Sequence, residues 1–138
     1  MKMDEIDGLI VHELKQNSRL SMRELAKKVN LSAPSVAERV KKLEIEGVIK
    51  GYSVVLDQAK MGSPVQVLME VTVRNGAYDA FRRELSRRNE IEFAYRVAGK
   101  ACFFLKINLA SLEELEKFID EVRAQVMTES YIILSQVK

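Results

Sequence analysis

The spacing of apolar residues changes from a helical to a strand period near Gly47, and that change limits the folds open to this chain. Up to about residue 46, apolar residues recur every three or four positions, which places them on one face of a helix. After Gly47 the spacing falls to two, as in a strand with one buried face. A chain of 138 residues can hold two small domains. The sequence therefore predicts an α+β protein whose all-helical part precedes a part built on a sheet.

Three short helices are predicted before Gly47. Ser21 and Glu24 have the spacing of a capping box, so the second helix should begin there. Asn30 suits the left-handed exit of that helix. The third helix should begin at Ser32, because Pro34 then falls in the first turn, where a missing amide hydrogen is harmless. Two helices joined by so short a turn are typical of a helix-turn-helix, although an inert three-helix bundle has the same pattern.

The positive charge is concentrated in this helical part. The whole chain has a net charge of only +2. Residues 15–50 contain nine basic and four acidic residues, whereas residues 61–138 contain eleven of each. A local excess of this kind favours a DNA-binding role for the helices, and a merely solvated basic face is the alternative.

The rest of the chain predicts a ferredoxin-like βαββαβ domain. Residues 48–56 are rich in β-branched side chains and predict a strand that follows the helices. Residues 57–64 contain glycine and proline and predict a linker. The predicted domains are thus 1–57, a winged-helix-like helix-turn-helix with its following strand, and 65–138, a dimerisation and effector-type domain.

One face of this sheet is predicted to lack helices. Alternation places Leu68, Ala94 and Phe104 there, among polar residues. The last strand contributes either Ile132 and Leu134 or Tyr131 and Ile133. Apolar side chains on an open face predict a homodimer interface, and isolated apolar residues on a monomer surface are the alternative.

The third helix predicts which residues meet DNA. With Val36 and Val40 turned inward, Ser35, Glu38 and Lys42 face outward and are candidates for base edges. Arg39 lies on the flank, where it either grips phosphate or forms an intradomain ion pair. The remaining candidates for phosphate contacts are basic side chains and helix starts: Arg19, Ser21, Lys27, Lys28, Ser32 and Lys41.

No enzyme, metal or cofactor is expected. His12 is the only histidine and Cys102 the only cysteine, so no nucleophile–base pair, disulfide or metal-ligand spacing can be argued. The first residues are charged and no long apolar run follows, so neither a signal peptide nor a membrane span is expected. A cytoplasmic location follows from these two observations.

Several motifs resemble the Lrp/AsnC, or feast/famine, family of transcriptional regulators. They are Asp4-x-x-Asp7, Asn17-Ser18-Arg19-Leu20-Ser21, Glu24-Leu25-Ala26, Leu31-Ser32 and, most specific of all, Glu38-Arg39-Val40-Lys41-Lys42-Leu43-Glu44-x-x-Gly47-Val48-Ile49-Lys50-Gly51-Tyr52. The resemblance covers nearly the whole chain. It implies dimers whose sheets pack face to face, larger assemblies up to hexadecamers, binding and bending of promoter DNA, and in many members an amino-acid effector.

One loop departs from the family pattern. Members that bind amino acids often have Gly-x-x-Asp between the second and third strands, and here Cys102 follows Gly99 at the aspartate position. The resemblance places a small-molecule effector at the loop Ala98, Gly99, Lys100, Ala101 and Cys102, but cysteine cannot anchor an ammonium group. Two alternatives therefore remain open: an architectural protein that wraps DNA without an effector, and a ligand-binding module whose helix-turn-helix contacts proteins.

Overall fold

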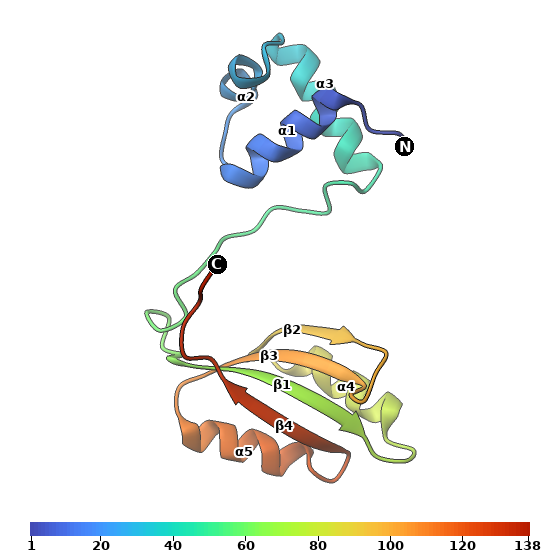
Figure 1. Cartoon of the computed structure of the whole chain (residues 1–138), viewed down its shortest axis with the longest axis vertical. Helices are drawn as coiled ribbons and strands as arrows, with labels where there is room; N and C mark the ends of the chain where they lie inside the picture. The colour runs from blue at the N-terminus through green and yellow to red at the C-terminus, as the bar shows by residue number, and fades with distance from the viewer. The chain divides into compact units, whose positions relative to one another are not determined.

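The computed structural model describes residues 1–138 and divides them into two compact units, Met1–Val55 and Leu56–Lys138. Each unit has its own cluster of buried apolar side chains. Figure 1 shows that the first unit contains only helices and that the second contains all four strands. The all-helical part therefore precedes the part built on a sheet, and the first strand begins only at Val65.

The first unit consists of α1 (Glu5–Gln16), α2 (Met22–Val29) and α3 (Ala33–Ile45). The predicted helix starts are confirmed. The Ser21 hydroxyl accepts a hydrogen bond from the Glu24 amide (3.1 Å), and the Ser32 hydroxyl accepts one from the Ser35 amide (3.3 Å). Asn30 ends α2 in the left-handed conformation, at φ 57°. Capped ends and a left-handed exit make the short α2–α3 turn of a helix-turn-helix.

The strand predicted at residues 48–56 is absent, so this prediction is wrong. The segment leaves α3 without regular secondary structure, and Val54, Val55 and Leu56 are exposed. The residue types favour an extended conformation, but a strand exists only when a neighbour supplies its hydrogen bonds. No other strand of this chain pairs with the segment.

The second unit has the predicted βαββαβ order. Its elements are β1 (Val65–Val73), α4 (Tyr78–Arg87), β2 (Ile91–Arg96), β3 (Phe103–Leu109), α5 (Leu112–Val122) and β4 (Val126–Ile132). The strands lie in the order β2-β3-β1-β4, and every neighbouring pair is antiparallel. Both helices lie on one side of the sheet (Figure 1), and their apolar residues join those of the inward sheet face in one core. The ferredoxin-like fold is therefore confirmed.

A bulge in β2 changes which side chains reach the open sheet face. The pairing of β2 with β3 shifts between Ile91 and Phe93, so Ala94 lies opposite Leu105 and Tyr95 lies opposite Phe104. Opposed residues of an antiparallel pair point to the same side, and Leu105 is in the core. Strict alternation predicts Ala94 on the open face, which is wrong. An extra residue in one strand inverts all positions after it, and alternation in the sequence does not reveal it.

Arg88 ties the two helices of this unit to the start of β2. Its guanidinium lies 2.9 Å from Glu84, 3.0 Å from Glu90 and 2.8 Å from Glu121. It also lies over the Phe118 ring, 4.8 Å from the centroid. Only 14% of the Arg88 side chain is exposed, so removing it would leave three carboxylates close together with only the exposed Lys117, 4.0 Å from Glu121, as a neighbouring cation.

Arg88→Ala should lower the free energy of unfolding of the second unit by on the order of 2 kcal/mol, less than for a fully buried network because the glutamates are partly solvated. Denaturant titrations at one fixed protein concentration measure this change. Arg87→Ala is the matched control, because Arg87 is exposed and forms no ion pair. Equal losses for the two variants would contradict a stabilising role for the Arg88 cluster.

Candidate DNA-binding interface

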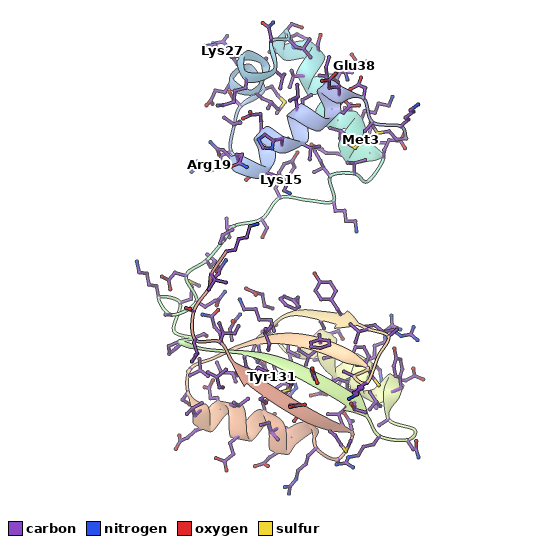
Figure 2. All side chains as sticks on the ribbon, in the orientation of Figure 1. Met3, Lys15, Arg19, Lys27, Glu38 and Tyr131 are labelled. Atoms are coloured by element: carbon purple, nitrogen blue, oxygen red, sulfur yellow. The ribbon has the colours of Figure 1, made fainter.

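The exposed face of α3 gathers the three residues predicted to read bases. Val36, Val40 and Leu43 are buried in the core of the first unit, which turns the opposite face of α3 outward. Ser35, Glu38 and Lys42 line one hollow of about 460 Å³. Figure 2 shows Glu38 on this helix, projecting away from the core. The fold thus brings together the three side chains that the sequence predicts to read bases.

Lys2 lines the same hollow. Figure 1 shows the N-terminal segment running beside α3, and Figure 2 places Met3 close to that helix. No motif in the sequence singles out this lysine, because only the path of the chain before α1 brings it to α3.

Arg39 is held inside the first unit by two aspartates. Its Nη1 lies 2.7 Å from Asp4 Oδ2 and 3.0 Å from Asp7 Oδ1. Asp4 and Asp7 also cap α1 reciprocally: the Asp7 amide donates to Asp4 Oδ1 (2.8 Å) and the Asp4 amide donates to Asp7 Oδ2 (3.1 Å). Of the two roles that the sequence leaves open for Arg39, the structure shows the intradomain ion pair.

This cluster, Asp4, Asp7 and Arg39, anchors the recognition helix. Asp7 is the only charged residue in the buried core, with 5% of its surface exposed, and its partner is on α3. The hydrogen bond from Arg39 is the main reason that the pKa of Asp4 lies below its ordinary value, and bonds to both aspartates raise the pKa of Arg39. In the sequence, Asp4 and Asp7 stand out only as motif residues, because their contact with α3 depends on the tertiary fold.

The remaining predicted DNA contacts spread over the rest of the first unit. Lys41 is exposed on α3, while Lys27 and Lys28 are exposed on α2. Lys28 lies 3.9 Å from Glu13, a long and solvated ion pair that leaves it available to phosphate. Figure 2 shows Arg19 beside Lys15 at the end of α1, on the opposite side of the unit from Glu38.

The hydroxyl groups of Ser21 and Ser32 cap the starts of α2 and α3. The Ser21 and Ser32 hydroxyls both accept amide hydrogen bonds, and Ser32 Oγ also donates to Ser35 Oγ (2.8 Å). A phosphate at these positions would therefore meet the free amides of the helix starts rather than the Ser21 and Ser32 hydroxyls.

The predicted effector loop joins β2 to β3 in the second unit. The Val97 amide donates to the Cys102 carbonyl (3.0 Å), and the Cys102 amide donates to the Val71 carbonyl (2.7 Å). Ala101 is buried, Cys102 is partly buried, and Ala98, Gly99 and Lys100 are exposed. The loop is thus a hairpin anchored at its C-terminal end, with an exposed tip.

The open face of the sheet is more aromatic than strict alternation along the strands predicts. The bulge brings Phe93 and Tyr95 to it, with their ring centroids 5.1 Å apart. Tyr95 lies opposite Phe104, and Leu68 lies opposite Tyr131. Of the two sets that the sequence allows for the last strand, the one containing Tyr131 therefore lies here. Leu68, Tyr95, Phe104 and Tyr131 are all exposed large apolar side chains.

Two family models match the chain. An AsnC-type helix-turn-helix domain matches residues 3–44, and an Lrp/AsnC ligand binding domain matches residues 66–138. The chain belongs to the Lrp/AsnC family of transcriptional regulators. The HTH-type transcriptional regulator LrpC of Bacillus subtilis is 48% identical over 137 residues, which are 99% of this chain and 95% of that protein. The Escherichia coli leucine-responsive regulatory protein is 30% identical over 143 aligned positions, covering 99% and 87% of the two chains.

Solved structures agree with this membership. The structure of B. subtilis LrpC matches with a TM-score of 0.96 over 100% of this chain and 99% of that one, at 48% identity. Mycobacterium tuberculosis LrpA, a leucine response regulatory protein, matches with a TM-score of 0.84 at 31% identity, covering 99% and 95% of the two chains. The predicted family and fold class are therefore confirmed, and the chain is a transcriptional regulator. No helix is long and apolar enough to cross a bilayer.

The Asp4–Arg39 contact predicts a pH dependence with a defined sign. Because the folded-state pKa of Asp4 lies below its ordinary value of 3.8, the contact stabilises the folded unit above that pH. Its contribution disappears as the pH falls through the lower folded-state pKa. The thermal midpoint of Asp4→Asn should therefore lie below that of the unmodified chain at neutral pH, and the two midpoints should converge as the pH falls below 3.8.

Circular dichroism melts across this pH range measure the convergence. Glu5→Gln is the control, since Glu5 is exposed in the first turn of α1 and forms no ion pair. A constant difference between Asp4→Asn and the unmodified chain at all pH values would contradict the assignment.

Proposed function

We propose that the chain regulates transcription as a homodimer that reads the major groove of a specific DNA site with α3. The observation that carries the proposal is the hollow on α3, where Ser35, Glu38 and Lys42 project together from a helix whose other face is fully buried. An α-helix fits the major groove, where each base pair has its own pattern of donors and acceptors.

The three side chains supply complementary readout chemistry. The Glu38 carboxylate can accept from a cytosine amino group, and the Lys42 ammonium can donate to guanine. The Ser35 hydroxyl can donate or accept. The Asp4–Asp7–Arg39 cluster supports this readout because it fixes the start of α1 against α3. Arg39 is therefore assigned to positioning rather than to phosphate.

Phosphate contacts orient the helix on the duplex and supply most of the salt-dependent affinity. The proposed groups are basic side chains and the free amides at the starts of α2 and α3: Arg19, Ser21, Lys27, Lys28, Ser32 and Lys41. These contacts carry no sequence information, so they are expected to act equally on all DNA.

Substitutions of neighbouring lysines separate base contacts from phosphate contacts. Lys42→Ala and Glu38→Ala should weaken binding to a DNA site selected from random sequence by about tenfold to a hundredfold and change the preferred base. Lys41→Ala should weaken binding to all DNA alike and reduce the salt slope by about one. Fluorescence anisotropy over a range of salt concentrations measures both effects.

Lys117→Ala, on α5 of the second unit, and Cys102→Ser are controls that should leave DNA affinity nearly unchanged. Unaltered binding by Lys42→Ala would show that α3 does not read the site. If selection from random DNA yields no preferred site, the result would favour the architectural alternative. In that alternative, the protein wraps DNA with little sequence choice and no effector.

A dimer is proposed because the open sheet face resembles an interface more than a solvated surface. Its exposed apolar residues lie on adjacent strands and include three aromatic rings, which monomers rarely expose together: Phe104, Tyr95, Tyr131 and the neighbouring Leu68. Packing against the same face of a second copy would bury them around a twofold axis. Two recognition helices would then read a pseudo-palindromic site, and larger assemblies can be built from such dimers.

Phe104→Glu tests this interface. A buried carboxylate near Glu70, its cross-strand neighbour, should weaken dimerisation by roughly a hundredfold or more. Light scattering during size-exclusion chromatography measures the mass over a dilution series. Leu112→Glu is the control, because Leu112 is exposed on α5, on the other side of the sheet. If Phe104→Glu keeps the mass of the unmodified chain at all dilutions, the dimer is not formed by this face.

We also propose that the second unit binds a small effector and that the chain needs no metal or other cofactor and is not an enzyme. The matching family model is described as a ligand binding domain. A Neisseria meningitidis regulator with the same fold was solved as a complex with L-Met, but at 22% identity it supports the fold alone. Cys102 replaces the acidic residue of the family loop, which weakens the case for an amino acid bound there. A cytoplasmic location is proposed with this role.

A further inference from the structure

A second hollow, of about 400 Å³, lies in the second unit between α4 and β2. It is lined by four residues of α4 and three of the sheet: Tyr78, Arg82, Leu85, Ser86, Ala94, Arg96 and Phe103. The bulge in β2 explains it, because it turns Ala94 to the side of the sheet that carries α4, where a methyl group leaves an open space beside that helix. None of the five residues of the predicted effector loop lines this hollow.

Two positive charges in this hollow have no internal partner. Neither Arg82 nor Arg96 forms an ion pair, whereas nearby Arg88 contacts three glutamates. The Arg96 guanidinium instead lies over the ring of Tyr78, 5.6 Å from its centroid, a contact that holds it at the rim. No carboxylate lines the hollow, so its electrostatic character is purely positive.

Tyr78 adds an unsatisfied polar group. Its hydroxyl oxygen is buried and has no hydrogen-bond partner, although buried hydroxyls are nearly always bonded. Its ring stacks on Phe103 at 5.4 Å, so the side chain cannot easily turn to find a partner elsewhere. The two guanidinium groups are exposed, and they offer charge-assisted donors to an anionic ligand with several oxygens.

We propose that this hollow binds a small organic carboxylate with a compact apolar body and no ammonium group, such as a keto acid. The arginines fit a carboxylate, which guanidinium groups bind in a bidentate manner. Leu85 and Phe103 form an apolar wall for the rest of the ligand. An amino acid fits worse, because its ammonium group would be desolvated beside two cations with no acid to receive it. The inference rests on the proposal that the second unit binds an effector, and it names that effector's chemical class.

Matched pairs of probes separate the two ligand classes. Phenylpyruvate and phenylalanine share one apolar body, as do ketoisocaproate and leucine, and the members of each pair differ only at the amino or keto group. Isothermal titration of the full chain should show saturable binding of at least one keto acid with a Kd below about 1 mM, a modest affinity for an open site. The corresponding amino acid should bind at least tenfold more weakly.

Variants tie the binding to this hollow. Arg96→Gln and Arg82→Gln should each weaken keto-acid binding by about tenfold or more, because each removes a charge-assisted contact. Ala94→Leu should abolish binding by filling the space. Arg83→Gln is the matched control, since Arg83 is exposed on the same helix but does not line the hollow, and it should bind as the unmodified chain does. Thermal melts identify any variant that fails to fold, and Arg96→Gln changes only a surface side chain.

The inference is overturned if neither keto acid binds at about 5 mM, which is far above the expected Kd. It is also overturned if each amino acid binds as tightly as its keto acid, or if Arg82→Gln, Arg96→Gln and Ala94→Leu all leave the affinity unchanged. Displacement of the keto acid by equimolar inorganic phosphate would show that any small anion suffices and would overturn the assigned class. The proposal that α3 reads DNA is tested separately, by DNA binding of Lys42→Ala. Failure of the carboxylate site can therefore be distinguished from failure of the DNA-binding proposal.

Discussion

The second unit is a four-stranded sheet with two helices on one side only, so one face of the sheet is buried and the other is left open. The core uses the inward positions of β1 and β3 and Val126 of β4, together with the apolar faces of α4 and α5. The outward positions must then be either solvated or covered by another molecule. Because β2 is an edge strand with a bulge, its aromatic residues Phe93 and Tyr95 join the open face, while Ala94 turns to the side of the sheet that carries α4 and stays exposed there. One irregularity therefore shapes both the proposed dimer surface and the proposed carboxylate site.

Each unit contains an arginine that is closely paired with carboxylates and an exposed cation without an ion pair. Arg39 and Arg88 are each partly or largely buried, and each is matched by several carboxylates from other elements. These arginines join helices to their neighbours and are unavailable to ligands. Lys42 and Arg96 are exposed and form no ion pair, so they can meet an anionic partner. The closely paired and partly buried arginines thus hold the fold, whereas the exposed cations are those proposed to bind.

Much of the fold follows from local patterns in the sequence. Ser21 with Glu24, Asn30 and Ser32 with Pro34 mark the ends of α2 and α3 because caps act over three or four residues. The alternation in β1 and β3 predicts their buried faces, and the structure confirms both. The reading face of α3 follows from its helical period, since Val36, Val40 and Leu43 are all buried. These features depend only on neighbours along the chain.

The sequence by itself determined the two-part organisation, the helix caps and the outward set Ser35, Glu38 and Lys42. Only the tertiary structure decided that Arg39 pairs with Asp4 and Asp7, that residues 48–56 have no strand partner, and that Ala94 faces α4. The physical reason is the same in each case. A helical period is set by hydrogen bonds within the segment, whereas an ion pair, a sheet ladder or a bulge depends on residues far away in the chain.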